Sequence, residues 1–295
     1  MPDQLKEGRR LKTMLPLLIC VTFLWAGCNS GDGSNTTSNS GSVPAPVAPT
    51  VAAGDWYRPP LNVTWQWQLK GKVNTGYPVE IYDIDLFDSS ELLIDSIQSS
   101  GSKAICYFSA GSYEKWRPDV SEFSEADLGE TPEGWEDEKW LDIRSANVRR
   151  IMQKRLDLAK QKGCDGVEPD NMDGYDNDSG FDLSATDQLA FNRFIADEAH
   201  KRGLSVGLKN DLDQVKQLVE YFDFSVNEQC HEFDECGQLS PFIKSGKPVL
   251  NAEYQEELIT NAVKRQPLCD AAAREEFSTL ILPLTLDDSF RYSCS

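Results

Sequence analysis

Acidic side chains recur at the ends of predicted β-strands, and their positions suit catalysis better than those of any other residue type. Glu168 and Asp170 end one predicted strand, and Glu228 follows another. Because side chains alternate along a strand, Glu168 and Asp170 share one face, as do Asp83 and Asp85. Crowded carboxylates repel one another, which raises some pKa values and lets a protonated acid stand beside an ionised one. The hydrolysis of a glycosidic bond requires such a pair.

Other polar and aromatic side chains lie near the same strand ends. We predict that eight of them bind substrate or tune the catalytic pKa values: Asp83, Asp85, Tyr107, Glu168, Asp173, Lys209, Glu253 and Tyr254. Aromatic rings can stack on the apolar faces of sugars or under cations. No serine or cysteine nucleophile has comparable support, because His200 lies within a predicted helix beside two basic residues.

Metal sites are weaker alternatives. Five aspartates crowd between Asp170 and Asp182, but the run Asp176 to Gly180 lacks the oxygen ligand at the fifth position and the glycine at the sixth of an EF-hand loop. A zinc site is disfavoured because the cysteine spacings do not fit and the only histidines are His200 and His231. We therefore expect neither a metal nor a cofactor.

Alternating strands and helices must position these residues, a pattern typical of parallel βα units. The predicted strands are Thr64 to Leu69, Val79 to Leu86, Ala104 to Ser109, Gly166 to Asp170, Ser205 to Lys209, Phe222 to Asn227, Pro248 to Glu253 and Thr279 to Leu284. The predicted helices are Glu91 to Ser99, Ser145 to Gln161, Asp187 to Arg202, Gln214 to Tyr221, Leu239 to Lys244 and Glu256 to Arg265. Eight strands with helical connections favour a (β/α)8 TIM barrel, whose catalytic groups lie at the C-terminal strand ends. No glycine-rich phosphate loop supports a nucleotide-binding fold.

Length and charge set broad limits on function. The chain has 295 residues and is 40% hydrophobic, which suits a single catalytic domain. The formal net charge of -19 argues against a nucleic-acid partner and is compatible with a cationic or neutral ligand. We expect a monomer.

The N-terminal segment is typical of export. A basic stretch precedes the apolar run Leu15 to Ala26, which has signal-peptide length. Leu24-Trp25-Ala26-Gly27-Cys28 resembles a bacterial lipobox, so we predict a signal peptide over residues 1–27 and lipidation of Cys28. An ordinary signal peptide is the alternative. Residues 28–54 are rich in Ser, Gly, Asn, Thr, Pro and Ala, which predicts a disordered tether before a catalytic domain at 55–295. The expected location is the bacterial cell envelope or the exterior, with an outer-membrane lipoprotein favoured.

Six cysteines remain in the exported part, and an even number in an oxidising compartment predicts disulfides. Six cysteines allow fifteen pairings. Cys230 with Cys236 is the best local candidate, and Cys269 with Cys294 could hold the C-terminus. Cys106 and Cys164 are expected to be buried and could also pair.

Several motifs, taken together, resemble glycoside hydrolase family 114, the endo-α-1,4-polygalactosaminidases. They are Trp65-Gln66-Trp67-Gln68-Leu69, Tyr82-Asp83-Ile84-Asp85, Ile105 to Gly111, Trp140-Leu141-Asp142-Ile143, Asp165 to Asn171, Gly207-Leu208-Lys209-Asn210 and Asn227-Glu228-Gln229-Cys230. The resemblance runs from about residue 56 to the C-terminus.

The resemblance implies a (β/α)8 barrel that cleaves partly deacetylated α-1,4-linked galactosamine polymers internally. It also implies catalytic roles for Asp170 and Glu228, whereas strand alternation alone does not separate Asp170 from Glu168. We expect a retaining mechanism with Asp170 as nucleophile and Glu228 as acid/base, with an inverting one as the alternative. Two other functions stay open: a tethered, non-catalytic polysaccharide-binding lipoprotein, and a hydrolase of another α-linked glycan.

Overall fold

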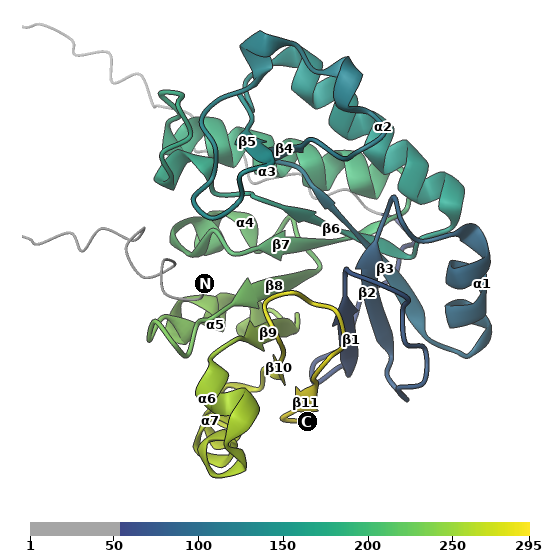
Figure 1. Ribbon diagram of the computed structural model, residues 1–295, viewed down its shortest axis with the longest axis vertical. Helices are drawn as coiled ribbons and strands as arrows, with labels where there is room; N and C mark the ends of the chain where they lie inside the picture. Colours follow the sequence, from purple (N-terminus) through teal and green to yellow (C-terminus); the bar gives the residue numbers. More distant parts are fainter. Residues whose placement is uncertain (1–53) are drawn as a thin grey trace, which may run out of the picture. The chain divides into compact units, whose positions relative to one another are not determined.

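Short strands with almost entirely buried side chains form the centre of the molecule (Figure 1). The computed structural model describes residues 54–295, so the predictions on the signal peptide, Cys28 and all but the last residue of the tether lie outside the described residues. Nine strands form one sheet in the order β1-β2-β3-β6-β7-β8-β9-β10-β11. Their bounds are β1 Trp65–Gln68, β2 Ile81–Asp85, β3 Lys103–Ser109, β6 Gly166–Asp170, β7 Ser205–Lys209, β8 Phe224–Glu228, β9 Val249–Glu253, β10 Ser278–Ile281 and β11 Tyr292–Ser293.

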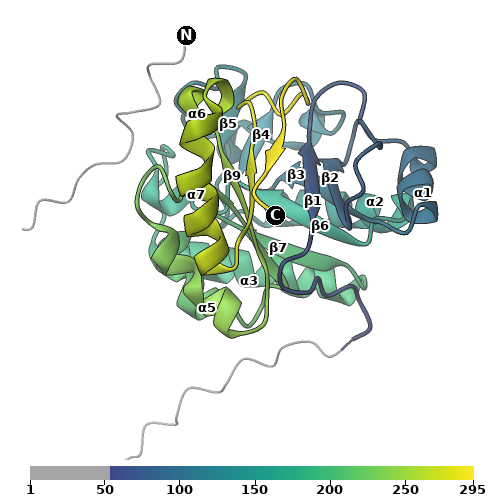
Figure 2. The same cartoon turned by 90° about the horizontal axis from the view of Figure 1, so that it is seen from below.

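The sheet curls until its first and last parallel strands meet. The indole Nε1 of Trp65 donates a hydrogen bond to the carbonyl of Ser278 at 2.8 Å. The carbonyl of Leu286 accepts a hydrogen bond from the backbone N–H of Leu69 at 3.0 Å. Figure 2 shows the C-terminal segment, in yellow, beside β1. We call this junction the seam. All eight predicted strands are present, and the (β/α)8 barrel prediction is confirmed.

Helices cover the outer side of the sheet, and Figure 1 shows α1, α2 and α3 there. The helices are α1 Glu91–Ser99, α2 Ala146–Lys162, α3 Ala185–Lys201, α4 Val215–Leu218, α5 Ser240–Lys244, α6 Glu256–Thr260 and α7 Ala262–Glu275. Short 3-10 turns occur at Val120–Glu122, Glu125–Asp127, Gly174–Asp176, Leu212–Gln214 and Cys236–Leu239. Among residues 54–295, no helix has the length and apolar character needed to cross a bilayer.

Helix ends follow local capping chemistry. Ser184 and Asp187 form a capping box at the start of α3, as their spacing predicts. The predicted helix Glu256 to Arg265 is wrong in its extent, because it is interrupted at Asn261. The Asn261 side chain accepts a hydrogen bond from the N–H of Val263 at 3.0 Å and so begins a new helix, α7.

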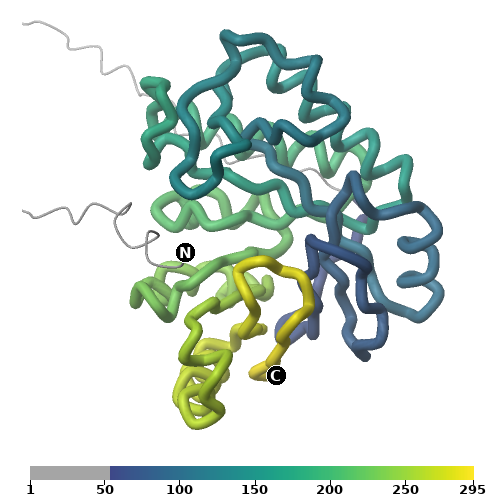
Figure 3. The backbone as a smooth tube through the Cα atoms, viewed as in Figure 1, coloured from purple at the N-terminus to yellow at the C-terminus, as the bar shows by residue number. Residues whose placement is uncertain are grey.

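A two-stranded hairpin was not predicted from the sequence. Strands β4 (Ser112–Glu114) and β5 (Glu138–Trp140) pair antiparallel within the long connection from β3 to α2. Figure 3 traces this connection in blue-teal at the top of the view. The hairpin follows the C-terminal end of β3, so it belongs to the catalytic end of a TIM barrel.

Three disulfides cross-link the described residues. Cys230 pairs with Cys236 and Cys269 with Cys294, as predicted. Cys106 pairs with Cys164, which joins β3 to the turn before β6. The Cys269–Cys294 bond ties α7 to the C-terminal segment and thus supports the seam.

Candidate active site

The ammonium group of Lys209, at the end of β7, is the centre of a cluster of carboxylates. Its Nζ lies 3.0 Å from Asp170 Oδ1, 3.1 Å from Glu168 Oε1 and 3.3 Å from Glu228 Oε2. The lysine is buried, and its Nζ lies 4.9 Å from the centre of the Trp67 ring. Burial alone would lower the pKa of Lys209, but the charges of the three acids outweigh it and hold that pKa well above its ordinary value. Lys209 therefore remains cationic and draws the acids together.

Asp170 and Glu228 are the two members of this cluster that reach the surface. Their side chains are 20% and 24% exposed. The Tyr107 hydroxyl donates to Asp170 Oδ2 at 2.9 Å, and the Tyr254 hydroxyl donates to Glu228 Oε1 at 2.5 Å. Burial, followed by the nearby carboxylate, raises both tyrosine pKa values well above the ordinary range, so both remain hydrogen-bond donors.

The two exposed carboxylates lie close enough to act on one bond. Since both contact Lys209 Nζ, Asp170 Oδ1 and Glu228 Oε2 are at most 6.3 Å apart, the sum of 3.0 and 3.3 Å. Retaining glycosidases place their carboxyl groups ~5 to 5.5 Å apart and inverting ones ~6.5 to 9.5 Å. The upper limit of 6.3 Å on the distance between Asp170 Oδ1 and Glu228 Oε2 is therefore compatible with the separation found in retaining glycosidases.

Left-handed backbone turns fix the ends of these strands. Asn171 and Asn210 have φ values of 58° and 48°, a conformation that asparagine tolerates better than most residues. The N–H of Asn171 donates to Asp170 Oδ1 at 2.6 Å. The side-chain oxygen of Asn210 accepts from the N–H of Glu228 at 3.1 Å. Each asparagine thus supports one of the two exposed acids.

A buried acid pair lies beneath the exposed one. Asp83 and Glu168 have no exposed surface, and both Asp83 oxygens and Glu168 Oε2 receive no hydrogen bond from an N–H or hydroxyl donor. The two carboxyl groups lie within hydrogen-bonding reach of each other. Burial raises the pKa of Glu168 to about 7, and burial with the charge of Glu168 raises that of Asp83 well above its ordinary value. The raised pKa values indicate that the pair holds a proton, and the roles of both acids in substrate binding or in tuning the catalytic pKa values stay a prediction.

Asp85 and Glu253 are buried, and each accepts hydrogen bonds from protein groups. Asp85 accepts two hydrogen bonds from Arg117, at 3.0 and 2.7 Å, which anchors the β3–α2 connection. Glu253 Oε1 accepts from the N–H of His231 at 2.9 Å and so supports the loop after Glu228. Their predicted contact with substrate stays a prediction.

Asp173 stands partly exposed just after β6. Burial, followed by the charge of Asp173, raises the pKa of Asp211 to about 9. Asp173 thus acts on the turn after β7, and its predicted contact with substrate stays a prediction.

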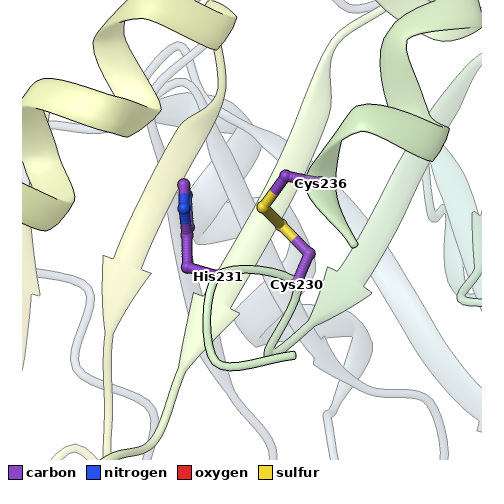
Figure 4. Close-up of side chains that lie close together, drawn as sticks. All are labelled: Cys230, His231 and Cys236. Carbon is purple, nitrogen blue, oxygen red and sulfur yellow. A yellow bond between two sulfur atoms is a disulfide. The ribbon is translucent and has the colours of Figure 1, made fainter. Parts of the chain in front are cut away.

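The loop after Glu228 contains three residues with metal-ligand spacing. Candidate ligand atoms of Cys230, His231 and Cys236 lie within 4.8 Å of one another. Figure 4 shows that the two sulfur atoms are bonded to each other. Zinc binds the thiolate form of cysteine, so this group is a structural disulfide in its oxidised form.

The hairpin base packs directly against the Asp170-Asn171 segment. A Cβ atom on Gly111 would lie 1.8 Å from the carbonyl oxygen of Asn171, so only glycine fits this close approach. The N–H groups of Ala110 and Gly111 donate to the carbonyl of Asp170 at 2.9 and 3.1 Å. The position of the hairpin is therefore coupled to that of Asp170.

A second contact joins the hairpin to the same segment. The Asn171 amide donates to Ser112 Oγ at 3.2 Å, and Ser112 Oγ donates to Glu138 Oε2 at 2.7 Å. Burial, opposed by the hydrogen bond from Ser112, raises the pKa of Glu138 to about 7. Sequence analysis missed Glu138 because only the fold brings β5 to this strand end.

Comparisons with known proteins agree with this geometry. The family described as Glycoside-hydrolase family GH114 matches residues 46–295. A crystal structure of Aspergillus fumigatus Ega3 in complex with galactosamine is 44% identical, covers 82% of this chain and 99% of that chain, and has a TM-score of 0.78. The glycoside hydrolase domain of PelA from Pseudomonas aeruginosa is 13% identical, covers 78% of this chain and 98% of that chain, and has a TM-score of 0.60, which supports the fold alone.

No curated protein matches the chain. The family match covers all of the described barrel, including the strands that carry Asp170, Lys209 and Glu228. The chain therefore belongs to glycoside-hydrolase family GH114 and is a glycosidase.

Proposed function

We propose that the chain is an endo-acting glycosidase that cleaves α-1,4-linked galactosamine-containing polysaccharide. The observation that carries the proposal is the exposed Asp170–Glu228 pair, held by one lysine at the catalytic end of the barrel. Similarity to a structure that binds galactosamine supports the choice of sugar. The net charge of -19 suits a polymer that carries ammonium groups.

We propose a retaining mechanism, with which the upper limit of 6.3 Å between the nearest oxygens of Asp170 and Glu228 is compatible. In the first step Asp170 attacks the anomeric carbon, the glycosidic C–O bond breaks, and protonated Glu228 gives its proton to the leaving oxygen. In the second step water attacks the same carbon, Glu228 takes up the water's proton, and the bond to Asp170 breaks. Tyr107 and Lys209 orient Asp170 for the attack.

Turnover of a defined polymer tests this proposal. Purified α-1,4-galactosamine polymer should yield new reducing ends together with an early fall in average chain length, because endo cleavage cuts internal bonds. The first product should keep the α configuration in proton NMR; a β product would establish the inverting alternative. Pull-down on the polymer without any reducing ends would instead identify a binding protein. Turnover restricted to other α-linked glycans in a substrate panel would change the assigned sugar.

We also propose that the domain is exported and held at a membrane by a lipid on Cys28, with residues 28–54 as the tether. The supporting features are the basic start, the apolar run and the small residues before Cys28. A palmitate analogue should label the wild-type chain and leave it in the membrane fraction. The Cys28→Ser variant should be unlabelled and soluble. Equal labelling of both chains would refute lipidation at this residue.

A further inference from the structure

Two large aromatic side chains project into solvent from the β4–β5 hairpin. Trp116 is 54% exposed and Trp135 is 49% exposed. Trp116 lies two residues beyond the end of β4, and Trp135 lies three residues before the start of β5. Antiparallel pairing continues past the strands, since the N–H of Lys115 donates to the carbonyl of Asp137 at 3.1 Å. Trp116 and Trp135 therefore lie at the same end of the hairpin, the end at which β4 finishes and β5 begins (Figure 1 shows the two strands).

The backbone that carries Trp116 and Trp135 is held in place by hydrogen bonds and by the ion pairs of a neighbouring residue. Trp116 precedes Arg117, a buried residue that binds Asp85 and Glu114 and lies 5.8 Å from the Trp116 ring. The N–H of Trp135 donates to the carbonyl of Pro132 at 3.1 Å. Groups that are already ordered lose little conformational entropy when they bind a ligand. Exposed rings on such a support are suited to recognition.

The hairpin also stands in a defined relation to the catalytic acids. Its base contacts the Asp170-Asn171 segment through Gly111 and Ser112. Trp135 precedes Glu138 by three residues, a separation of at most ~10 Å even along extended backbone. The indoles thus lie away from the cleaved bond but on the same end of the barrel.

The charge around the indoles indicates the kind of ligand. Glu133 and Glu136 are exposed on either side of Trp135. Two lysines lie near this segment: Lys115 is paired with Asp137 at 3.2 Å, and the Nζ of Lys139 donates to the carbonyl of Gly129 at 3.4 Å. Stacking suits the apolar face of a pyranose ring, and unpaired carboxylates suit ammonium groups. An amino sugar offers both features in one unit.

We propose that Trp116 and Trp135, flanked by Glu133 and Glu136, form a binding surface for amino-sugar units of the polymer outside the cleavage site. This inference rests on the proposed function. The surface holds the chain while Asp170 and Glu228 act on a bond some units away. It therefore contributes to the binding of long substrates and not to the chemical step.

The Trp116→Ala/Trp135→Ala double variant tests the surface. Its KM for the long galactosamine polymer should rise about tenfold or more, with kcat unchanged, because two stacking contacts are lost in every state of the reaction. Its kcat/KM on the shortest cleavable oligosaccharide should equal that of the wild type. Trp135→Tyr, which keeps a ring, should restore most of the polymer affinity. Glu133→Gln/Glu136→Gln should weaken binding of the deacetylated polymer but not of a fully N-acetylated one.

Leu92→Ala provides the matched control, because Leu92 is 80% exposed on α1, outside the hairpin. An unchanged KM for the polymer in the double variant would refute the proposed binding surface. Equal losses of kcat/KM on long and short substrates would refute it as well. Thermal unfolding of each variant shows whether the hairpin is intact. If the wild-type chain does not cleave the polymer, the proposed function fails; if it does and the double variant matches it, only the surface fails.

Discussion

Replacing Asp170 by asparagine, or Glu228 by glutamine, is expected to lower kcat on the galactosamine polymer by about 1,000-fold or more. Both replacements keep the size of the side chain and retain an oxygen that can accept from Tyr107 or Tyr254. An amide at residue 170 is a poor nucleophile, and an amide at residue 228 gives up no proton. Because the two acids act in the same reaction, the double variant should be little worse than either single one.

The two roles separate on a substrate with a good leaving group. An aryl glycoside whose phenol leaves without protonation should restore much of the activity of Glu228→Gln but none of that of Asp170→Asn. A reversed pattern would exchange the roles of nucleophile and acid/base. Asp178→Asn is the matched control, because Asp178 is exposed on the same loop and is not among the predicted site residues. If both single variants keep most of the wild-type activity, the catalytic assignment is wrong.

Lys209→Met is expected to lower kcat by about 100-fold or more at neutral pH and to move the acid limb of the pH profile upward. The ammonium contacts Glu168, Asp170 and Glu228, so its loss leaves three close carboxylates without a counter-ion. Their mutual repulsion favours the protonated forms of the carboxyl groups, in which the nucleophile is inactive. A higher pH should therefore recover part of the lost rate.

The buried acid pair supplies the control for this prediction. Asp83→Asn places a neutral amide that can donate to Glu168, so it should leave kcat within about threefold of the wild type. Asp83→Ala removes the donor, Glu168 then takes up the proton, and the contact with Lys209 weakens. The acid limb should shift in Asp83→Ala and Lys209→Met but not in Asp83→Asn. An unshifted limb in Lys209→Met would show that the lysine does not control the ionisation of the acids.

The strand ends could be predicted from the sequence, because the signals that mark a strand lie within a few consecutive residues. Alternation and β-branched residues mark each parallel strand, and the strand ends bring Asp170, Lys209 and Glu228 to one end of a barrel. Asn171 and Asn210 stand at those ends for an equally local reason, since asparagine accepts the left-handed turn that follows.

The depth of each acid within the barrel could not be predicted from the sequence. Alternation shows which side of the sheet a side chain faces, but not how far it lies from the open end of the barrel. Glu168 lies two residues before Asp170 and therefore about 6.6 Å deeper along the strand, where Asp83 meets it. Asp85 faces the same way, but a residue of the β3–α2 connection, Arg117, binds it. Strands of three residues, as in β4 and β5, carry too little periodicity to be recognised, and their pairing depends on contacts across more than twenty residues.

The seam has a consequence for how the chain folds. The bond between Trp65 and Ser278 joins residues 213 positions apart. Chains are made at about 5 to 20 residues per second, so β1 emerges roughly 10 to 40 s before its neighbour across the seam exists. During that interval the first strand keeps one unpaired edge, which can pair with strands of other chains. The risk of aggregation of this barrel therefore depends on the time between the synthesis of β1 and the synthesis of β10.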